Sequence, residues 1–77
     1  MGKTAPFGAS TTFGERVRAR RNALGWSQEK LAEEAGLHWT YVGSVERGQR
    51  NISLRNIVVL AAALQIDPAK LIKGLVP

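Results

Sequence analysis

Apolar residues along this chain recur three or four positions apart, the spacing that places them on one face of a helix. The first such stripe includes Phe13 and Val17. We expect this helix to begin at Thr12, because Thr12 and Glu15 have the spacing of a capping box, which satisfies two backbone donors. Gly25 supplies a C-terminal stop. The pattern therefore predicts a first helix from Thr12 to the residue before Gly25.

Two short helices follow, separated by a turn at Gly36. Residues 28–35 have Leu31 on the apolar face and acidic side chains on the opposite face, which keeps that face in water. Ser27 is a favourable N-cap for this helix. The next helix covers roughly residues 39–47. The sequence thus predicts two helices joined by a tight turn.

A charged residue lies on the apolar stripe of the first helix and needs a partner. Arg21 follows Val17 by four residues and therefore points the same way. In the third helix, Val42 and Val45 point to the core, and Glu46 lies beside them. We predict that Arg21 and Glu46 form a buried or half-buried ion pair that joins the first helix to the third.

Two further helices complete the pattern. Ser53 caps a helix over about residues 54–64, which is apolar on nearly every side and must be covered all round. Asp67 and Pro68 are typical of an N-cap and a first helical position, so they open a short helix that Gly74 closes. The chain shows no alternation typical of strands. The predicted fold class is all-α, a bundle of five helices.

The 77 residues fit one domain. Residues 12–77 would hold the helices, and residues 1–11, rich in Gly, Ser, Thr and Pro, are expected to form a flexible arm. A domain of this size buries only about 60% of its unfolded surface, which favours oligomerisation. No stretch approaches the ~18 consecutive apolar residues of a membrane span, and the first residues lack the apolar core of a signal peptide. We expect a soluble, cytoplasmic protein.

Charge narrows the choice of partner. The chain has 11 lysines and arginines against 6 acidic residues, a net charge of +5. Such an excess favours polyanions, chiefly nucleic acid or an anionic membrane surface. The chain has no cysteine and a single histidine, and no glycine-rich phosphate loop follows a strand. The sequence therefore disfavours an enzyme and predicts neither a metal nor a cofactor.

The third predicted helix has residues suited to entering the major groove of double-stranded DNA. The face opposite its apolar side carries Thr40, Gly43, Ser44 and Arg47. The small Gly43 and Ser44 would let the backbone approach base edges, and Arg47 can bind guanine or phosphate. Trp39 flanks this face and either packs against the preceding helix or contacts sugars and thymine methyl groups. The plain alternative is a solvated face without a partner.

Other polar residues are placed for contact with phosphates. Ser27 and Gln28 lie at the N-terminus of the second helix, where free backbone N–H groups attract an anion. Arg50 and Asn51 lie in the loop before the fourth helix, and an ordinary solvated loop is the alternative for both. The outward arginines of the first helix either contact phosphates as well or only keep the protein soluble.

Three stretches of this chain resemble a known family, the Cro/C1-type or XRE-like helix-turn-helix regulators. They are RNALGWSQEKLAEEAGL, VERG and NISLRNIVVLAAALQIDP. The resemblance spans about residues 13–71 and implies a lambda-repressor-like fold and a sequence-specific DNA-binding transcription regulator. Within the family, YVGSVERGQRNISLRNI looks most like the controller proteins of bacterial restriction–modification systems. Those proteins are small dimers that regulate their own gene and the endonuclease gene. They commonly carry Asp-Arg where this chain has His38 and Trp39.

The resemblance also implies roles for single residues. Gln28 would contact the DNA backbone, and residues of the third helix would read bases. Together with the residues singled out above, the expected DNA contacts are Ser27, Gln28, Trp39, Thr40, Tyr41, Ser44, Arg47, Arg50 and Asn51. The pair Arg21 and Glu46 corresponds to a structural ion pair of phage-repressor relatives.

Members of this family form homodimers through their C-terminal helices. The apolar residues expected to form that surface here are Ile66, Leu71, Ile72, Leu75 and Val76. A two-fold dimer would place two recognition helices about 34–36 Å apart, one turn of DNA, and requires a near-palindromic operator. Beside a promoter, such a dimer could block or recruit RNA polymerase, a further partner to consider.

The sequence leaves three other functions open for this fold: a phage-type repressor, an antitoxin, and a protein-interaction module without specific DNA binding. The interaction module would keep its affinity at high salt. DNA binding through about 6–10 phosphate contacts should instead weaken ~10³–10⁵-fold between about 50 and 200 mM salt.

Overall fold

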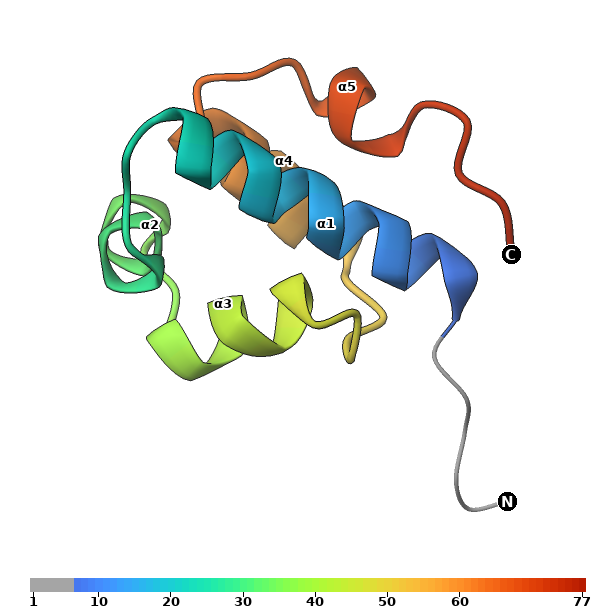
Figure 1. Ribbon diagram of the computed structural model, residues 1–77, viewed down its shortest axis with the longest axis horizontal. Helices are drawn as coiled ribbons and strands as arrows, with labels where there is room; N and C mark the ends of the chain where they lie inside the picture. Colours follow the sequence, from blue (N-terminus) through green and yellow to red (C-terminus); the bar gives the residue numbers. More distant parts are fainter. Residues whose placement is uncertain (1–6) are drawn as a thin grey trace.

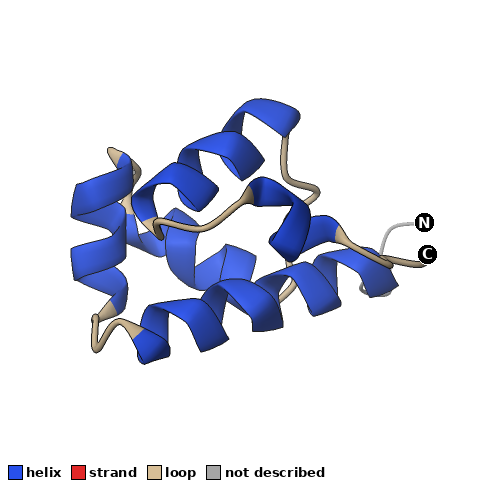
Figure 2. Cartoon of the chain, turned by 90° about the horizontal axis from the view of Figure 1, so that it is seen from above, coloured by secondary structure: helices blue, strands red, loops and turns tan. Residues whose placement is uncertain are grey.

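The computed structural model describes residues 7–77, which fold into five helices (Figure 1). The helices are α1 (Gly8–Ala23), α2 (Gln28–Ala35), α3 (Trp39–Glu46), α4 (Leu54–Ala63) and α5 (Pro68–Ile72). No strand occurs within residues 7–77 (Figure 2), so the predicted all-α fold class is confirmed. No helix in this part of the chain is long and apolar enough to cross a membrane.

The long helix α1 runs through the middle of the molecule, and the other helices pack around it (Figure 1). Helix α3 packs against α1 and α2, α4 packs against α2 and α5, and α5 returns to α1. The space between the helices is filled by Phe13, Val17, Leu31, Ala32, Val42, Val45, Leu60, Ala61, Leu64 and Leu71. The predicted apolar face of the third helix is therefore confirmed.

Helix α1 begins earlier than the sequence predicts. It starts at Gly8 and passes through both members of the expected capping box without a break, so the expected start at Thr12 is wrong. The C-terminal tail lies close to this first turn, because a Cβ on Gly8 would be 2.9 Å from the carbonyl oxygen of Pro77. Residues 8–11 are helical rather than part of an arm, whereas residues 1–6 of that predicted arm lie outside the described residues.

The capping chemistry of the other helices follows the sequence. The Oγ atoms of Ser27 and Ser53 accept backbone N–H groups at 3.0 and 3.1 Å, and Asp67 Oδ1 accepts one at 2.9 Å. His38 caps α3, because its Nδ1 accepts a backbone N–H of that helix at 3.2 Å. Gly36 ends α2 with a φ of 69°, a left-handed conformation that suits glycine. The boundaries of these four helices match the prediction to within one residue.

Two outward arginines of α1 hold the ends of other helices. Arg16 Nη1 donates to the carbonyl oxygens of Leu71 and Lys73 at 3.2 and 2.7 Å. Arg20 Nε donates to the carbonyl oxygen of Leu64 at 2.9 Å, and its Nη2 donates to the next carbonyl oxygen at 3.1 Å. The last carbonyls of a helix have no partner within the helix, so these cations satisfy them. Both arginines therefore have a structural role that the sequence did not reveal.

Helices α1 and α3 pack backbone against backbone at Gly14. A Cβ on Gly14 would clash with the carbonyl oxygen of Val45 and would lie 2.8 Å from that of Glu46. A residue without a side chain is therefore needed for the two backbones to touch. This contact sets the position of α3 against the core.

Candidate nucleic-acid interface

A buried ion pair anchors α3 to α1. Arg21 Nε donates to Glu46 Oε2 at 2.6 Å, and Nη2 donates to Oε1 at 2.9 Å. The side chains are 10% and 2% exposed, which confirms the predicted pair. The hydrogen bond to Glu46 raises the pKa of the Arg21 guanidinium. The third nitrogen, Nη1, donates to the carbonyl oxygen of Trp26 at 2.7 Å, so the same guanidinium also fixes the connection from α1 to α2.

Gln28 joins α2 to this ion pair. Its Nε2 donates to Glu46 Oε1 at 3.0 Å, and its side chain is half-buried. Because the N-terminus of α2 also presents free backbone N–H groups, Gln28 lies where an anion would be attracted. Ser27 precedes it, is exposed, and has its hydroxyl oxygen engaged as the N-cap. Three helices therefore meet at the Glu46 carboxylate.

A second network holds the loop after α3 against that helix. Ser44 Oγ donates to the carbonyl oxygen of Tyr41 at 2.8 Å and accepts from Arg50 Nε at 2.9 Å. The Arg50 guanidinium lies 5.2 Å from the centre of the Tyr41 ring, a cation–π contact. Asn56, which sequence reasoning missed, donates from Nδ2 to the Tyr41 hydroxyl at 3.0 Å. Ser44 is only 7% exposed. The expectation that it lies open on the outward face is wrong, because Arg50 covers it.

The N-terminal end of α3 is open to solvent. Trp39 is 53% exposed, and the ring of His38 stacks on it with centroids 6.0 Å apart. Thr40 is also exposed, with its hydroxyl 2.8 Å from His38 Nδ1. A large apolar ring and a hydroxyl group are thus available to a partner at this end of the helix.

The other end of the helix presents Arg47. Arg47 is exposed, and its Nε lies 3.4 Å from Gln49 Oε1. Its Nη1 and the Oε1 of Gln28 lie over Gly43, where a Cβ would be 3.2 and 3.4 Å from them. Gly43 is therefore buried, and its expected place on an open face is wrong. Asn51 is exposed in the loop beyond.

The predicted contacts fall into two groups. Hydrogen bonds or close contacts join five of them in two separate sets, Gln28 with Arg47 over Gly43, and Tyr41 with Ser44 and Arg50. The other four are exposed: Ser27, Trp39, Thr40 and Asn51. The exposed members offer guanidinium, amide, hydroxyl and aromatic groups, which suit phosphates and base edges. In residues 7–77 no three His, Asp or Glu side chains come together as a metal site.

Residues 17–71 match the model of the helix-turn-helix family. The chain is 52% identical over 58 residues to the control protein C.SmaI of Serratia marcescens, a match that covers 75% of this chain and 69% of that protein. The chain belongs to the helix-turn-helix family. The solved restriction-modification controller protein C.AhdI from Aeromonas hydrophila superposes with a TM-score of 0.82 and 54% identity, over 84% of this chain and 98% of that one. The P22 c2 repressor, solved with a synthetic operator, gives a TM-score of 0.74 and 35% identity, over 80% and 94%.

These similarities confirm the predicted Cro/C1-type helix-turn-helix regulator and its likeness to controller proteins. In helix-turn-helix terms, α2 and α3 are the two helices of the motif, joined by the turn at Gly36. The second helix of such a motif is the recognition helix. Both networks described above therefore brace the recognition helix of this helix-turn-helix protein, one on the α2 side and one on the loop side.

The residues expected to form a dimer surface differ in how far they are exposed. Leu71 is 1% exposed and belongs to the core of the protomer, so its expected role at a partner surface is wrong. It is on the inner face of α5, which packs on α1 and α4. Ile66 and Leu75 are half-buried. Ile72 and Val76 are 41% and 66% exposed and are open to a partner.

Helix α4 carries exposed apolar residues that were not among the residues expected to form the dimer surface. Leu54 is 76% exposed and Val58 is 49% exposed, and a spacing of four places them on the same side of the helix. The opposite side contains Leu60 and Leu64, which are fully buried. The expectation that α4 is covered all round is therefore not met within the protomer.

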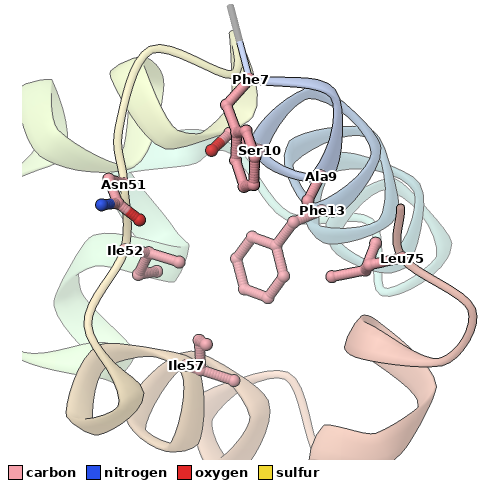
Figure 3. Close-up of a pocket in the computed structure, with 8 residues that line it drawn as sticks. All are labelled: Phe7, Ala9, Ser10, Phe13, Asn51, Ile52, Ile57 and Leu75. Atoms are coloured by element: carbon pink, nitrogen blue, oxygen red, sulfur yellow. The ribbon is translucent and has the colours of Figure 1, made fainter. Parts of the chain in front are cut away.

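A pocket of about 150 Å³ opens between the start of α1, the loop before α4 and the C-terminal tail (Figure 3). Its lining is formed by Phe7, Ala9, Ser10, Phe13, Asn51, Ile52, Ile57 and Leu75. Of the nine predicted DNA contacts, Asn51 alone borders it. Most of the side chains that line it are apolar.

Proposed function

We propose that this chain is a sequence-specific transcription regulator that binds a near-palindromic operator as a homodimer, in the manner of restriction–modification controller proteins. The observation that carries this proposal is the recognition helix, which is braced from behind by the buried pair of Arg21 and Glu46 while Trp39, Thr40 and Arg47 stay exposed. A helix held rigidly, with polar and aromatic side chains free, suits insertion into a major groove.

The roles of the individual residues follow from their surroundings. Thr40 and Trp39 would contact base edges and thymine methyl groups, and Arg47 would bind guanine or a phosphate. Ser27, Gln28 and the N-terminus of α2 would bind phosphate, which sets the register of the protein on the duplex.

Residues on the loop side act with Arg50. Ser44 and Tyr41 are both in contact with the Arg50 side chain, so they would orient it toward the DNA backbone rather than read bases themselves. Asn51 follows Arg50 in the same exposed loop and would contact the same strand.

A second copy of the chain is the expected partner at the C-terminal side. Exposed apolar side chains on α4 and beyond α5, namely Leu54, Val58, Ile72 and Val76, supply apolar surface for it. The P22 c2 repressor, 35% identical, is solved on an operator, which supports DNA as the other partner. The dimer would act in the cytoplasm, where an operator beside a promoter would bring it near RNA polymerase.

A protein-interaction module on the same fold is the second candidate. The observation in its favour is Trp39, whose 53% exposed ring would also suit a protein surface. Such a contact gains little from charge, so its affinity would survive an increase in salt.

A gel-shift titration on the DNA upstream of the chain's own gene, with excess competitor DNA, tests the proposal. We expect a competitor-resistant complex whose affinity falls ~10³–10⁵-fold between about 50 and 200 mM salt. Complexes that vanish under competitor at both salt concentrations would contradict it. Binding to a protein partner that is indifferent to salt would favour the interaction module.

A further inference from the structure

Gly43 occupies a position where the fold does not require glycine. It lies inside the eight-residue helix α3, and it is absent from the glycines with positive φ in the described chain. Glycine is among the least favourable residues in a helix interior. At Gly14 a side chain would strike backbone, but at Gly43 the three nearest atoms to an added Cβ all belong to the side chains of Arg47 and Gln28.

The orientation of those two side chains is set by groups behind them. Gln28 Nε2 donates a hydrogen bond to Glu46, which is itself bonded to Arg21. The other polar atom of the Gln28 amide, Oε1, is therefore turned toward Gly43. The Arg47 guanidinium lies back along α3, with Nη1 3.2 Å from the position of an added Cβ. An acceptor oxygen from α2 and the cation of Arg47, the C-cap residue of α3, therefore converge over the bare backbone of Gly43.

We propose that Gly43 is a specificity-determining residue of the interface. Without a Cβ, it lets the Arg47 guanidinium rest against α3 beside the Gln28 amide, and this placement selects the guanine edge that Arg47 contacts. An added Cβ at this position would lie 3.2 Å from Arg47 Nη1, so the guanidinium would have to shift by a few tenths of an ångström, and a larger side chain would displace it further. This inference rests on the proposed function, because it assigns how one residue of the DNA-binding surface is positioned.

The substitution Gly43→Ala separates a positioning role from a structural one. Thermal unfolding should show a melting temperature that is unchanged or higher by up to about 4–8 °C, because alanine favours the helix. Affinity for the operator should fall about 5- to 150-fold, the range of one misplaced base contact. The preference for one base should relax at the same base pair at which it relaxes in Arg47→Ala.

A matched control is Ala19→Gly at an exposed position of α1, which alters helix propensity in another helix and should leave base preference unchanged.

A double-mutant cycle gives the decisive readout. In the Arg47→Ala background, Gly43→Ala should change operator affinity by less than about 2-fold, because the group it displaces is gone. Additive losses, or wild-type affinity and preference in Gly43→Ala, would overturn the inference. A lower melting temperature with equal loss of affinity for all DNA sequences would do so too. If the wild-type chain itself fails to distinguish operator from competitor, the proposed function fails first and for a separate reason.

Discussion

Glu46 links the recognition helix α3 to both α1 and α2. Its side chain is 2% exposed, and its carboxylate accepts hydrogen bonds from Arg21 and Gln28. The pKa of Arg21 is raised by this contact, so the stabilising charged form is present throughout neutral pH. The stabilisation linked to this raised pKa is lost as the pH rises through the pKa of Arg21 in the folded state.

We predict that Glu46→Ala destabilises the fold by about 3–5 kcal/mol, because it leaves a buried guanidinium without its counter-charge. Chemical denaturation measures the loss. As a control, Arg21→Met combined with Glu46→Met removes both charges and should cost much less. An unchanged unfolding midpoint in Glu46→Ala would show that the pair contributes nothing to stability.

At the scale of helices, the crossing of α1 and α3 at Gly14 is the tightest contact that the glycines reveal. We predict that Gly14→Ala destabilises the protein by about 1–3 kcal/mol, because the added carbon meets backbone and the helices must separate. Urea unfolding gives the value. The same exchange at Gly43 meets only the tips of side chains and serves as the matched comparison. Equal stability of both variants would contradict this account of the packing.

The helices themselves were largely predictable, because their signals are local. Ser27, Ser53 and Asp67 cap the helices that follow them, as the sequence indicates. The start of α1 was not predictable, because its N-cap residue Phe7 makes no side-chain cap and its first turn lies close to Pro77 at the other end of the chain. A contact between the two ends of a chain leaves no trace in a local pattern.

The candidate site was predictable only where the spacing within one helix decides which side chains are exposed. Helical spacing correctly placed Val42 inside and Arg47 outside on α3. It failed for Gly43 and Ser44, because side chains from α2 and from the loop fold over them. A helical wheel describes one helix alone and contains nothing about what its neighbours cover.

At the scale of the whole molecule, exposed apolar residues predict assembly. Val58 is 49% exposed on the apolar side of α4. We predict that Val58→Lys keeps the helical content but shifts the chain toward a monomer in analytical ultracentrifugation, because a charge at an apolar interface must lose its hydration. Operator affinity should fall with the dimer.

The control for that experiment is Ala19→Lys, which adds the same side chain at an exposed position of α1. It should leave the sedimentation behaviour unchanged. A Val58→Lys protein that sediments like the parent chain would place the partner surface elsewhere.

The central claim is that two copies of α3 read a two-fold symmetric DNA site, and selection of bound sequences from a random DNA pool tests it most directly. The account predicts enrichment of a near-palindrome whose half-sites are centred about 10–10.5 base pairs apart, or a multiple of that spacing. An enriched set without symmetry, or no enrichment over the starting pool, would contradict it.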